Sequence, residues 1–544
     1  MRKIYINGDV YTVSNGMAEA FVVDKGKFIY AGSNDEALKY KDENCQVIDL
    51  KGRFVTAGFN DSHMHLVNYG YFLSMVNLYD STSSIRNIKE RLSTYILENS
   101  PHKDKWIIGR GWNQDYFEDE KRFPDRYDLD QVSTDYPIYI TRACGHIAVV
   151  NSKALELMGV NRDAPQIKGE EFDVDDKGEP LGIFRENAIN LIQKAVPSPS
   201  IEQIKDMIVK AAGKLNSYGI TSVQTDDFGA LPGVDYEDVI KAYKELETEG
   251  KLTVKVYEQA IFFKLKKIKD YISKGYNTGV GTAFFRLGPL KVVADGSLGA
   301  RTAYLSGPYS DDKSTRGIKY FSQEDLDSII SFANENGMQI AVHCIGDGIL
   351  KMVLSAFEKA LRTHNREDHR HGIVHCQITD EESLKKFSEL KLHAYIQSIF
   401  LNYDINIVEE RVGTLRAATS YNFKILMDKV VTSNGSDCPV ELPDVMAGIQ
   451  CAVTRKTLDG KKGPYLVNQA LSMEEAIKSF TIYGAHSSFE EGIKGSIEKD
   501  KVADFVILER SPFKADEESI KDIKILASYL NGNCVYEKKV GLIL

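Results

Sequence analysis

The sequence lacks any uncharged apolar run that approaches the roughly 20 residues needed to span a bilayer. The opening residues, MRKIYINGDVYTVSNG, also lack the apolar stretch of roughly 7–15 residues that a secretory signal needs. Neither a membrane partner nor export is therefore expected. The seven cysteines are odd in number and scattered, and no CxxC motif occurs. We therefore expect a cytoplasmic protein with small, buried, reduced thiols.

The chain also lacks an excess of basic charge. Its 68 lysines and arginines are outnumbered by 78 aspartates and glutamates, which gives a formal net charge of −10. Nucleic acid and anionic lipid repel a surface of this sign, so neither is expected as the main partner. A small-molecule substrate is the partner that we expect.

Several widespread catalytic motifs are missing as well. There is no GxSxG elbow, no GxxxxGK[ST] phosphate loop, no HExxH helix and no GxGxxG after an opening strand. The composition is that of an ordinary globular protein, with 43% hydrophobic and 27% charged residues. A length of 544 residues accommodates a large barrel with smaller attached domains.

Short β-rich runs alternate with capped helical stretches through the middle of the chain. The segment that starts at Ser200 and has Gln203 three positions later matches a capping box, and the strand-like ITSVQT follows that helix. Comparable helix starts occur at Ser322, Thr379 and Ser472. This alternation predicts βα units around a parallel sheet, and their number favours an α/β fold of the (β/α)8 barrel type.

The two ends of the chain have a different pattern, with short alternating runs separated by turns such as Asn7-Gly8 and Asn531-Gly532. We expect residues 1–57 and 490–544 to form one small β-sandwich, and residues 58–489 to form the barrel. The segment at about 113–197 is rich in Gly, Pro and Asp and does not resemble a βα unit. We expect it to be an insertion at the barrel mouth.

The strongest local indication of chemistry is FVTAGFNDSHMHL, residues 54–66. Side chains at i and i+2 of a strand point to the same side, so His63 and His65 can converge on one metal ion. Asp61 is a candidate to accept the hydrogen bond that fixes the tautomer of a ligand histidine. An HxH pair also arises by chance, and the pair alone leaves both interpretations open.

Three more ligand-type residues lie at the ends of later β-rich runs. His343 ends MQIAVH, His375 ends HGIVH and Asp437 follows VVTSNGS. The catalytic groups of a barrel collect at the C-terminal ends of its strands, so these residues and the HxH pair are expected to meet. The alternative is that His343 and His375 are ordinary core histidines.

Lys291, in the strand-like FFRLGPLKVVADGS, is a candidate bridge between two metal ions. An inward-pointing lysine is costly to bury as an ammonium, whereas carboxylation by carbon dioxide would turn it into an anionic carbamate. The alternative is a lysine that is paired with Asp295 or with another carboxylate of the site. Glu186, in GEPLGIFRENA, is a competing bridge, with a solvated glutamate at a helix start as its plainer interpretation.

The ordered set HxH, Lys, His, His, Asp resembles that of the amidohydrolase superfamily. Its YtcJ-like (amidohydrolase-3) branch, which includes proteins resembling N-substituted formamide deformylases, is similar in the segments GFNDSHMHL, GRGWNQDYF, RACGHIAVVNSKAL, GEPLGIFRENA, KVVADGSLGARTAYLSGPY, AVHCIGDGI, GSDCPVE and KGSIEKDKVADFVIL. This resemblance covers nearly the whole chain. It implies a distorted TIM barrel, a β-sandwich made from both termini, and Lys291 as a bridging carbamate.

The resemblance also implies the metal ligands and the reaction. His63, His65 and Asp437 would hold the more buried of one or two divalent metal ions, while His343 and His375 would hold the second. Zinc is the expected metal, with iron, manganese or nickel as alternatives. Metal-bound hydroxide would hydrolyse an amide-type C–N bond, as in an N-acyl or N-formyl amine, with Asp437 as the proton carrier. A homodimer is the assembly suggested by the family.

Five other residues are candidates around the site. His146 and Arg142, in ITRACGH, are candidates to stabilise the carbonyl oxygen if the insertion folds over the mouth. Trp112, Asp347 and Arg301 are candidates for substrate binding. The plainer interpretations are a surface loop for His146 and simple packing for Trp112.

Two other functions stay open. A deaminase of a cyclic amidine or heterocycle could use the same barrel, but such enzymes commonly carry a glutamate near the strand-end histidine. Here Gln377 follows His375, and no HxxE occurs there. The second alternative is a catalytically silent barrel with a binding or regulatory role, and the complete ligand set argues against it. Loop shape sets the substrate of a barrel enzyme and is not legible in the sequence.

Overall fold

The computed structural model describes residues 1–80, 83–102, 105–118, 120–166 and 171–538. The chain divides into two compact units. The first comprises Met1–Tyr69, Ile208–Ala230 and Asp235–Leu544, and the second comprises Gly70–Met207 and Leu231–Val234.

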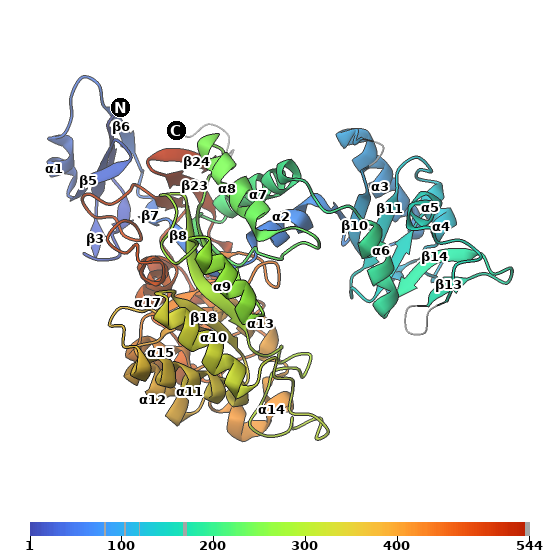
Figure 1. The fold of residues 1–544 in the computed structure, drawn as a ribbon. Coiled ribbons are helices and arrows are strands. Elements are labelled where there is room, and N and C mark those ends of the chain that lie inside the picture. Colours follow the sequence, from blue (N-terminus) through green and yellow to red (C-terminus); the bar gives the residue numbers. More distant parts are fainter. Residues whose placement is uncertain (81–82, 103–104, 119, 167–170, 539–544) are drawn as a thin grey trace. The chain divides into compact units, whose positions relative to one another are not determined.

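Eight strands, parallel throughout, form the main sheet of the first unit in the order β21-β20-β19-β18-β17-β16-β15-β8. They are β8 (Phe59–Met64), β15 (Ile220–Thr225), β16 (Lys255–Ile261), β17 (Phe285–Val293), β18 (Ile340–Cys344), β19 (Gly372–His375), β20 (His393–Ile396) and β21 (Thr432–Asn434). Figure 1 labels two of them, β8 and β18. The two edges meet beyond β8 and β21, where the Asp437 amide donates to the His63 carbonyl and the His65 amide donates to the Cys438 carbonyl, both at 2.8 Å. The expected (β/α)8 barrel is therefore confirmed.

Helices connect these strands. Those of the first unit are α1 (Asn34–Leu38), α8 (Tyr236–Thr248), α9 (Leu265–Ser273), α10 (Gln323–Glu335), α11 (Asp347–Thr363), α12 (Glu381–Glu389), α13 (Leu401–Asp404), α14 (Val408–Ala417), α15 (Phe423–Lys429), α16 (Val445–Thr454), α17 (Met473–Ser479) and α18 (Ile482–Ser487). Helices α2 (Leu66–Ser74) and α7 (Ile201–Asn216) contain residues of both units. The capping boxes expected at Ser200, Ser322 and Ser472 are present. The cap of α12 is Asp380 rather than Thr379, because the Asp380 carboxylate accepts a hydrogen bond from the Ser383 amide in the first turn of the helix.

Strands from both ends of the chain share a sheet, as expected. One sheet has the order β5-β4-β1-β6 and the other has the order β24-β23-β22-β7-β2-β3. Their strands are β1 (Lys3–Ile6), β2 (Asp9–Tyr11), β3 (Met17–Ala18), β4 (Ala20–Asp24), β5 (Lys27–Gly32), β6 (Gln46–Asp49), β7 (Phe54–Ala57), β22 (Phe505–Leu508), β23 (Ile525–Leu530) and β24 (Asn533–Glu537).

One aromatic core joins the two sheets. Tyr5 stacks on Phe21 with ring centroids 4.5 Å apart, and the Phe505 ring lies edge-on to both. Because Phe505 comes from the far end of the chain, this core ties the two termini together. The boundaries 1–57 and 490–544 stay a prediction, and residues 539–544 lie outside the described part.

The second unit has its own sheet, in the order β13-β14-β12-β11-β10-β9. Its elements are β9 (Val76–Asn77), α3 (Ile85–Asn99), β10 (Ile107–Trp112), α4 (Arg126–Asp130), β11 (Ile138–Arg142), β12 (Ile147–Val150), α5 (Ser152–Met158), β13 (Phe172–Val174), β14 (Pro180–Arg185) and α6 (Ile189–Ala195). The expected insertion at about 113–197 falls in this unit, which begins earlier, at Gly70. Its placement at the barrel mouth stays a prediction, and residues 119 and 167–170 lie outside the described part.

The described helices include none that is both long enough and apolar enough to cross a membrane. All seven cysteines are free thiols. Four of them are buried, as expected, whereas Cys144 and Cys534 are exposed and Cys45 is partly exposed.

Candidate metal centre

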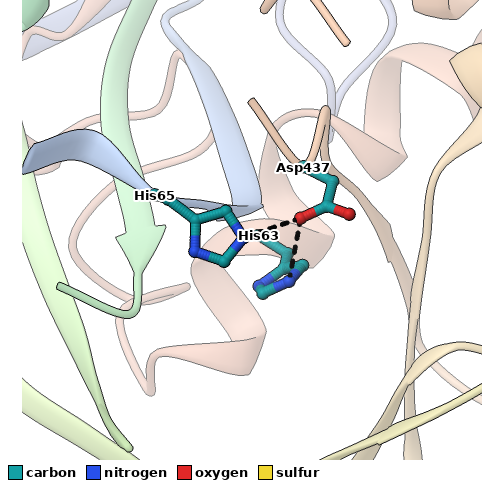
Figure 2. A group of neighbouring side chains, drawn as sticks. All are labelled: His63, His65 and Asp437. Carbon is teal, nitrogen blue, oxygen red and sulfur yellow. Dashed lines mark hydrogen bonds and ion pairs between the residues drawn. The ribbon is translucent and has the colours of Figure 1, made fainter. Parts of the chain in front are cut away.

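The HxH pair lies where β8 ends, and its two imidazoles converge on one carboxylate (Figure 2). Oδ1 of Asp437 is 3.0 Å from Nε2 of His65 and 3.4 Å from Nε2 of His63. His63 is buried, with 1% of its surface exposed, while the side chain of His65 is 28% exposed. The metal ion would thus have one side buried and one side open to solvent.

The backbone brings Asp437 to the pair. The barrel closes through the 2.8 Å hydrogen bond from the Asp437 amide to the His63 carbonyl, which places the last strand against the first. Asp437 and His375 both have positive φ angles, of 59° and 81°. Such a conformation costs a non-glycine residue about 1–3 kcal/mol, and this strain is typical of residues held for function.

Asp61 does not contact an imidazole ring, so the expectation that it fixes a ligand tautomer is wrong. Its carboxylate accepts hydrogen bonds from the main-chain amides of His63, at 3.2 Å, and Ser436, at 3.0 Å. Burial raises the pKa of Asp61 to about 7. Asp61 thus fastens the end of β8 to the segment after β21, and Nδ1 of His63 has no partner among the described residues.

Lys291 points into the barrel from β17, as the sequence predicted, and is 1% exposed. Its Nζ is 3.1 Å from Nε2 of His63 and 3.2 Å from Oδ2 of Asp226. Of the two partners left open by the sequence, Asp295 is not the one, because its carboxylate accepts the amides of Tyr304, at 2.8 Å, and Gly346, at 2.9 Å. Lys291 is paired with a different carboxylate of the site.

That carboxylate, Asp226, is the residue that sequence reasoning missed. It follows β15 directly, is buried, and forms a close ion pair through Oδ1 with Nδ1 of His65. Burial alone would raise the pKa of Asp226, but His65 and Lys291 outweigh it and lower that pKa far below the ordinary value. An acidic residue at the end of the strand-like ITSVQT was the available indication.

The other two predicted ligands lie on the neighbouring strand ends. The ring of His375 is 5.5 Å from that of His63 and 4.4 Å from that of His343, between centroids. Nδ1 of His375 is 2.8 Å from Oε1 of Gln397, and Nε2 of His343 is 3.1 Å from the Gly296 carbonyl. Burial, reinforced by His343, holds the pKa of His375 well below its usual range. A role in a second metal position stays a prediction for both.

The charges of the central group are strongly coupled. Burial lowers the pKa of His63, and Lys291 lowers it further. Burial would also lower the pKa of His65, but Asp226 and Asp437 outweigh it and raise that pKa well above normal. Burial would raise the pKa of Asp437, yet hydrogen bonds with both histidines hold it well below its usual range. The site therefore favours an ionised Asp437 beside a protonated His65.

The donor atoms of this group fit a divalent metal ion. The ligand atoms of His63, His65 and Asp437 all lie within 4.8 Å of one another, which no other group of three or more such side chains achieves in the described residues. Bonds of about 2.1 Å in a tetrahedral zinc site place neighbouring ligand atoms about 3.4 Å apart. The observed 3.0 Å and 3.4 Å are close to that spacing. Two imidazoles and one carboxylate with a further position free are the donor set of a catalytic zinc site.

Four of the other candidates lie in the second unit, and their roles toward the metal centre stay predictions. His146 is exposed, and its Nδ1 is 2.9 Å from Oε2 of Glu186, the competing bridge. The guanidinium of Arg142 is 2.8 Å from Asp115. Trp112 is completely buried in the core of this unit, which is the plainer interpretation given above.

The two remaining candidates already have partners within the first unit. Oδ1 of Asp347 accepts the Ser306 amide at 3.0 Å, at the start of α11. The guanidinium of Arg301 pairs with Asp311 at 2.8 Å. Substrate binding by Asp347 and Arg301 stays a prediction.

Known proteins of similar sequence indicate the family to which the chain belongs. The Amidohydrolase family matches residues 46–536. The chain is 32% identical to "Putative amidohydrolase YtcJ" of Bacillus subtilis, over 99% of this chain and 100% of that protein. It is 25% identical to N-substituted formamide deformylase of Arthrobacter pascens, over 98% of each chain.

A solved structure agrees with the sequence comparisons. The crystal structure of an uncharacterized metal-dependent hydrolase from Pyrococcus furiosus superposes with a TM-score of 0.78 at 30% identity, over 94% of this chain and 100% of that one. The family match spans most of the chain and confirms the resemblance that the motifs indicated. The barrel, the family match and the relatives agree: this chain belongs to the amidohydrolase family and is a metal-dependent hydrolase.

Proposed function

We propose that the protein hydrolyses an amide-type C–N bond in a small molecule, such as an N-acyl or N-formyl amine. The observation that carries the proposal is the convergence of the His63 and His65 imidazoles on Oδ1 of Asp437, at the C-terminal ends of the barrel strands β8 and β21. The name of one relative, N-substituted formamide deformylase, supports the choice of bond.

His63, His65 and Asp437 would hold a divalent metal ion, for which we propose zinc. His343 and His375 would hold a second ion, with Lys291 between the two as a carbamate. A metal ion in such a site polarises a carbonyl group and lowers the pKa of a bound water to about 7.

The proton transfers fall to Asp437 in this proposal. Both imidazole contacts use its Oδ1, which leaves Oδ2 for the reaction. The carboxylate would accept a proton from the attacking water and then donate it to the leaving nitrogen, so that the amine departs as a neutral molecule. This order needs Asp437 to be ionised before attack.

Residues further out would recognise the substrate. His146 and Arg142 are proposed to stabilise negative charge on the carbonyl oxygen, and Trp112, Asp347 and Arg301 to contact the substrate. We also propose a cytoplasmic setting, which the seven free thiols support. We also propose a homodimer as the assembly, from the resemblance to the family.

Metal analysis and a substrate panel test this function. Purified protein is assayed for bound metal and then incubated with N-formyl and N-acyl amines, with release of the carboxylate and the amine measured for each. Aminated heterocycles are included, and ammonia release from them alone would favour the deaminase alternative. We expect a His63→Ala variant to lose activity and most of its metal. Metal-free, inactive wild-type protein that is no more stable than His63→Ala would contradict the proposal.

A matched control keeps the result specific. His371 is a fully buried histidine that directly precedes β19, so it lies at the opposite end of that strand from His375. It contacts Asn334 and the Ile340 amide rather than the metal group. A His371→Ala variant should keep its metal content even where its stability falls.

A further inference from the structure

Strand pairing places Asp226 beside the HxH pair. In the register between β15 and β8, Thr225 lies opposite Met64, and the Asp226 amide donates to the Met64 carbonyl at 3.2 Å. Asp226 therefore leaves β15 at the level where His65 leaves β8. With 5% of its surface exposed, it faces the barrel interior rather than solvent.

Each carboxylate oxygen of Asp226 has a separate partner in the metal group. Oδ1 pairs closely with Nδ1 of His65, and Oδ2 is 3.2 Å from Nζ of Lys291. The same Nζ is 3.1 Å from Nε2 of His63. One side chain thus connects a histidine on the first barrel strand to the lysine on the fourth.

The contact with His65 fixes which nitrogen is available to a metal ion. An ionised carboxylate only accepts hydrogen bonds, so Nδ1 of His65 must carry the proton that faces Asp226. In a neutral imidazole the lone pair is then on Nε2, which is the nitrogen 3.0 Å from Oδ1 of Asp437. Carboxylates that orient ligand histidines in this way commonly tune metal affinity.

We propose that Asp226 is a positioning residue of the metal centre, which sets the tautomer of His65 through one oxygen and the place of Lys291 Nζ through the other. The proposal rests on the proposed function in that a divalent metal binds at His63, His65 and Asp437. It adds the end of a sixth barrel strand, β15, to the ends of β8, β18, β19 and β21, which carry the proposed ligands, and to the lysine strand β17.

The contact between Asp226 and Lys291 can form with the lysine as an amine and with the lysine as a carbamate. In carbamate formation the neutral amine adds to carbon dioxide, a C–N bond forms and one proton leaves, while one N–H remains on Nζ. Asp226 Oδ2 can accept that N–H, which would direct the new carboxylate away from Asp226 and toward His63. Loss of Asp226 should therefore weaken the metal group and the modification together.

The segment that carries Asp226 is itself firmly held. The next residue, Asp227, is buried, donates its amide to Oε1 of Glu258 at 2.8 Å and accepts the Val67 amide at 2.8 Å. The hydroxyl of Tyr243 also donates to Asp227. These bonds hold the residue that follows Asp226, so an isosteric change at position 226 should leave the fold in place.

Metal titration of the full-length protein tests the proposal. Metal-free wild type, Asp226→Asn and Asp404→Asn are titrated with Zn²⁺ in competition with a chromophoric chelator, and with Co²⁺ while its visible absorption is recorded. Asp404→Asn is the matched control, because Asp404 is a buried carboxylate that accepts hydrogen bonds from Tyr421 and Gln377 and contacts none of the ligands. We expect Asp226→Asn to bind Zn²⁺ about 10–100-fold more weakly with an altered Co²⁺ spectrum, and the control to match wild type.

Carbon dioxide labelling gives a second readout. In ¹³C-bicarbonate, a carbamate resonance in the metal-loaded wild type should weaken in Asp226→Asn. Equal Zn²⁺ affinity and an identical Co²⁺ spectrum in Asp226→Asn and wild type would overturn the proposal. Absence of Zn²⁺ binding in the wild type would instead overturn the proposed function. If Asp226→Asn does not fold, Asp226→Glu is tested in its place. Its displaced carboxylate should shift the Co²⁺ spectrum. An unchanged spectrum and an unchanged Zn²⁺ affinity would contradict the proposal.

Discussion

The main-chain amide of Asp437 donates a 2.8 Å hydrogen bond to the carbonyl of His63. The bond that closes the barrel therefore also delivers the carboxylate to the imidazoles. The positions of His63 and Asp437 relative to each other thus depend on the closure of the barrel. Changes that disturb the closure should therefore also disturb metal binding.

Gly435 lies at this closure and tolerates no side chain. A Cβ on it would lie 2.6 Å from the His63 main-chain nitrogen and 2.8 Å from Oδ1 of Asp61. Backbone cannot move aside cheaply, so we expect Gly435→Ala to cost about 1–3 kcal/mol of unfolding free energy, as overpacking does, and to lower the bound metal. Urea unfolding and metal analysis measure the two effects.

Gly213, inside α7, is the control for this substitution. Nothing lies within 4 Å of a Cβ built there, and its backbone is helical. Gly213→Ala should stabilise the protein by up to about 1 kcal/mol and leave the metal in place. Equal metal contents in the two variants would refute the link between closure and metal binding.

The Asp437→Asn variant tests the role of Asp437 in proton transfer with little change to the fold. Asparagine keeps the shape of the side chain but cannot accept a proton at neutral pH, and it is a poorer metal ligand than a carboxylate. We expect kcat to fall by about 10²–10⁴-fold, the usual worth of a general acid–base group, with at most a small change in Tm. Activity on any substrate found with the panel, measured at saturating metal, gives the result. A kcat within about threefold of wild type would exclude the role of Asp437 as general base.

A buried ion pair fastens the barrel to the terminal sandwich. Nζ of Lys255, on β16, contacts Oδ2 of Asp504, just before β22, and both side chains are almost completely buried. Removal of the lysine would leave the Asp504 charge buried and unpaired, so we expect Lys255→Met to cost about 3–5 kcal/mol in urea unfolding. Lys274→Met, which removes an exposed pair with Glu237, should change stability far less, because solvent screens that pair. Similar losses in both variants would show that burial of the first pair does not matter.

Asp404 should make stability depend on pH. Burial raises its pKa from 3.8 to about 6, so the folded protein binds this proton more tightly than the unfolded chain does. Stability contributed by the proton is complete below about pH 4 and is lost as the pH rises through 6, by at most about 3 kcal/mol.

The variant Asp404→Asn tests this dependence. Its amide oxygen can still accept the hydrogen bond that Tyr421 donates to Asp404, but it does not titrate. The free energy of unfolding, measured in urea from pH 4 to pH 7, should decline less with pH in the variant than in the wild type. Parallel curves for the two proteins would mean that Asp404 has an ordinary pKa.

The barrel and most of the metal group could be predicted because both follow from position along the strands. His63, His343 and Asp437 each follow or end a β-rich run, and the parallel barrel brings such ends to one edge whatever lies between them. The shared sheet of the two termini could also be predicted, because both ends of the chain consist of short alternating runs without a helical period. These properties depend on local patterns rather than on exact contacts.

The contacts around the ligands could not be predicted in the same way. Asp226 contacts His65 because Thr225 pairs with Met64, and this register between two strands leaves no mark in the sequence. Asp61 was expected to reach a ring, yet the closure leaves the Ser436 amide in need of an acceptor, and Asp61 supplies it. The hydrogen-bond partners of Asp226 and Asp61 thus depend on how the strands pack, which the sequence does not reveal.

The closing contact also sets the order of events during synthesis. His65 and Asp437 are 372 residues apart in the chain. A ribosome that adds about 5–20 residues per second needs roughly 20–75 s to cover that distance, so the nascent chain carries both histidines long before their carboxylate exists. If these residues bind a metal ion as proposed, its loading would follow translation of the last barrel strand, and a product truncated before Asp437 would carry the histidines without the proposed third ligand.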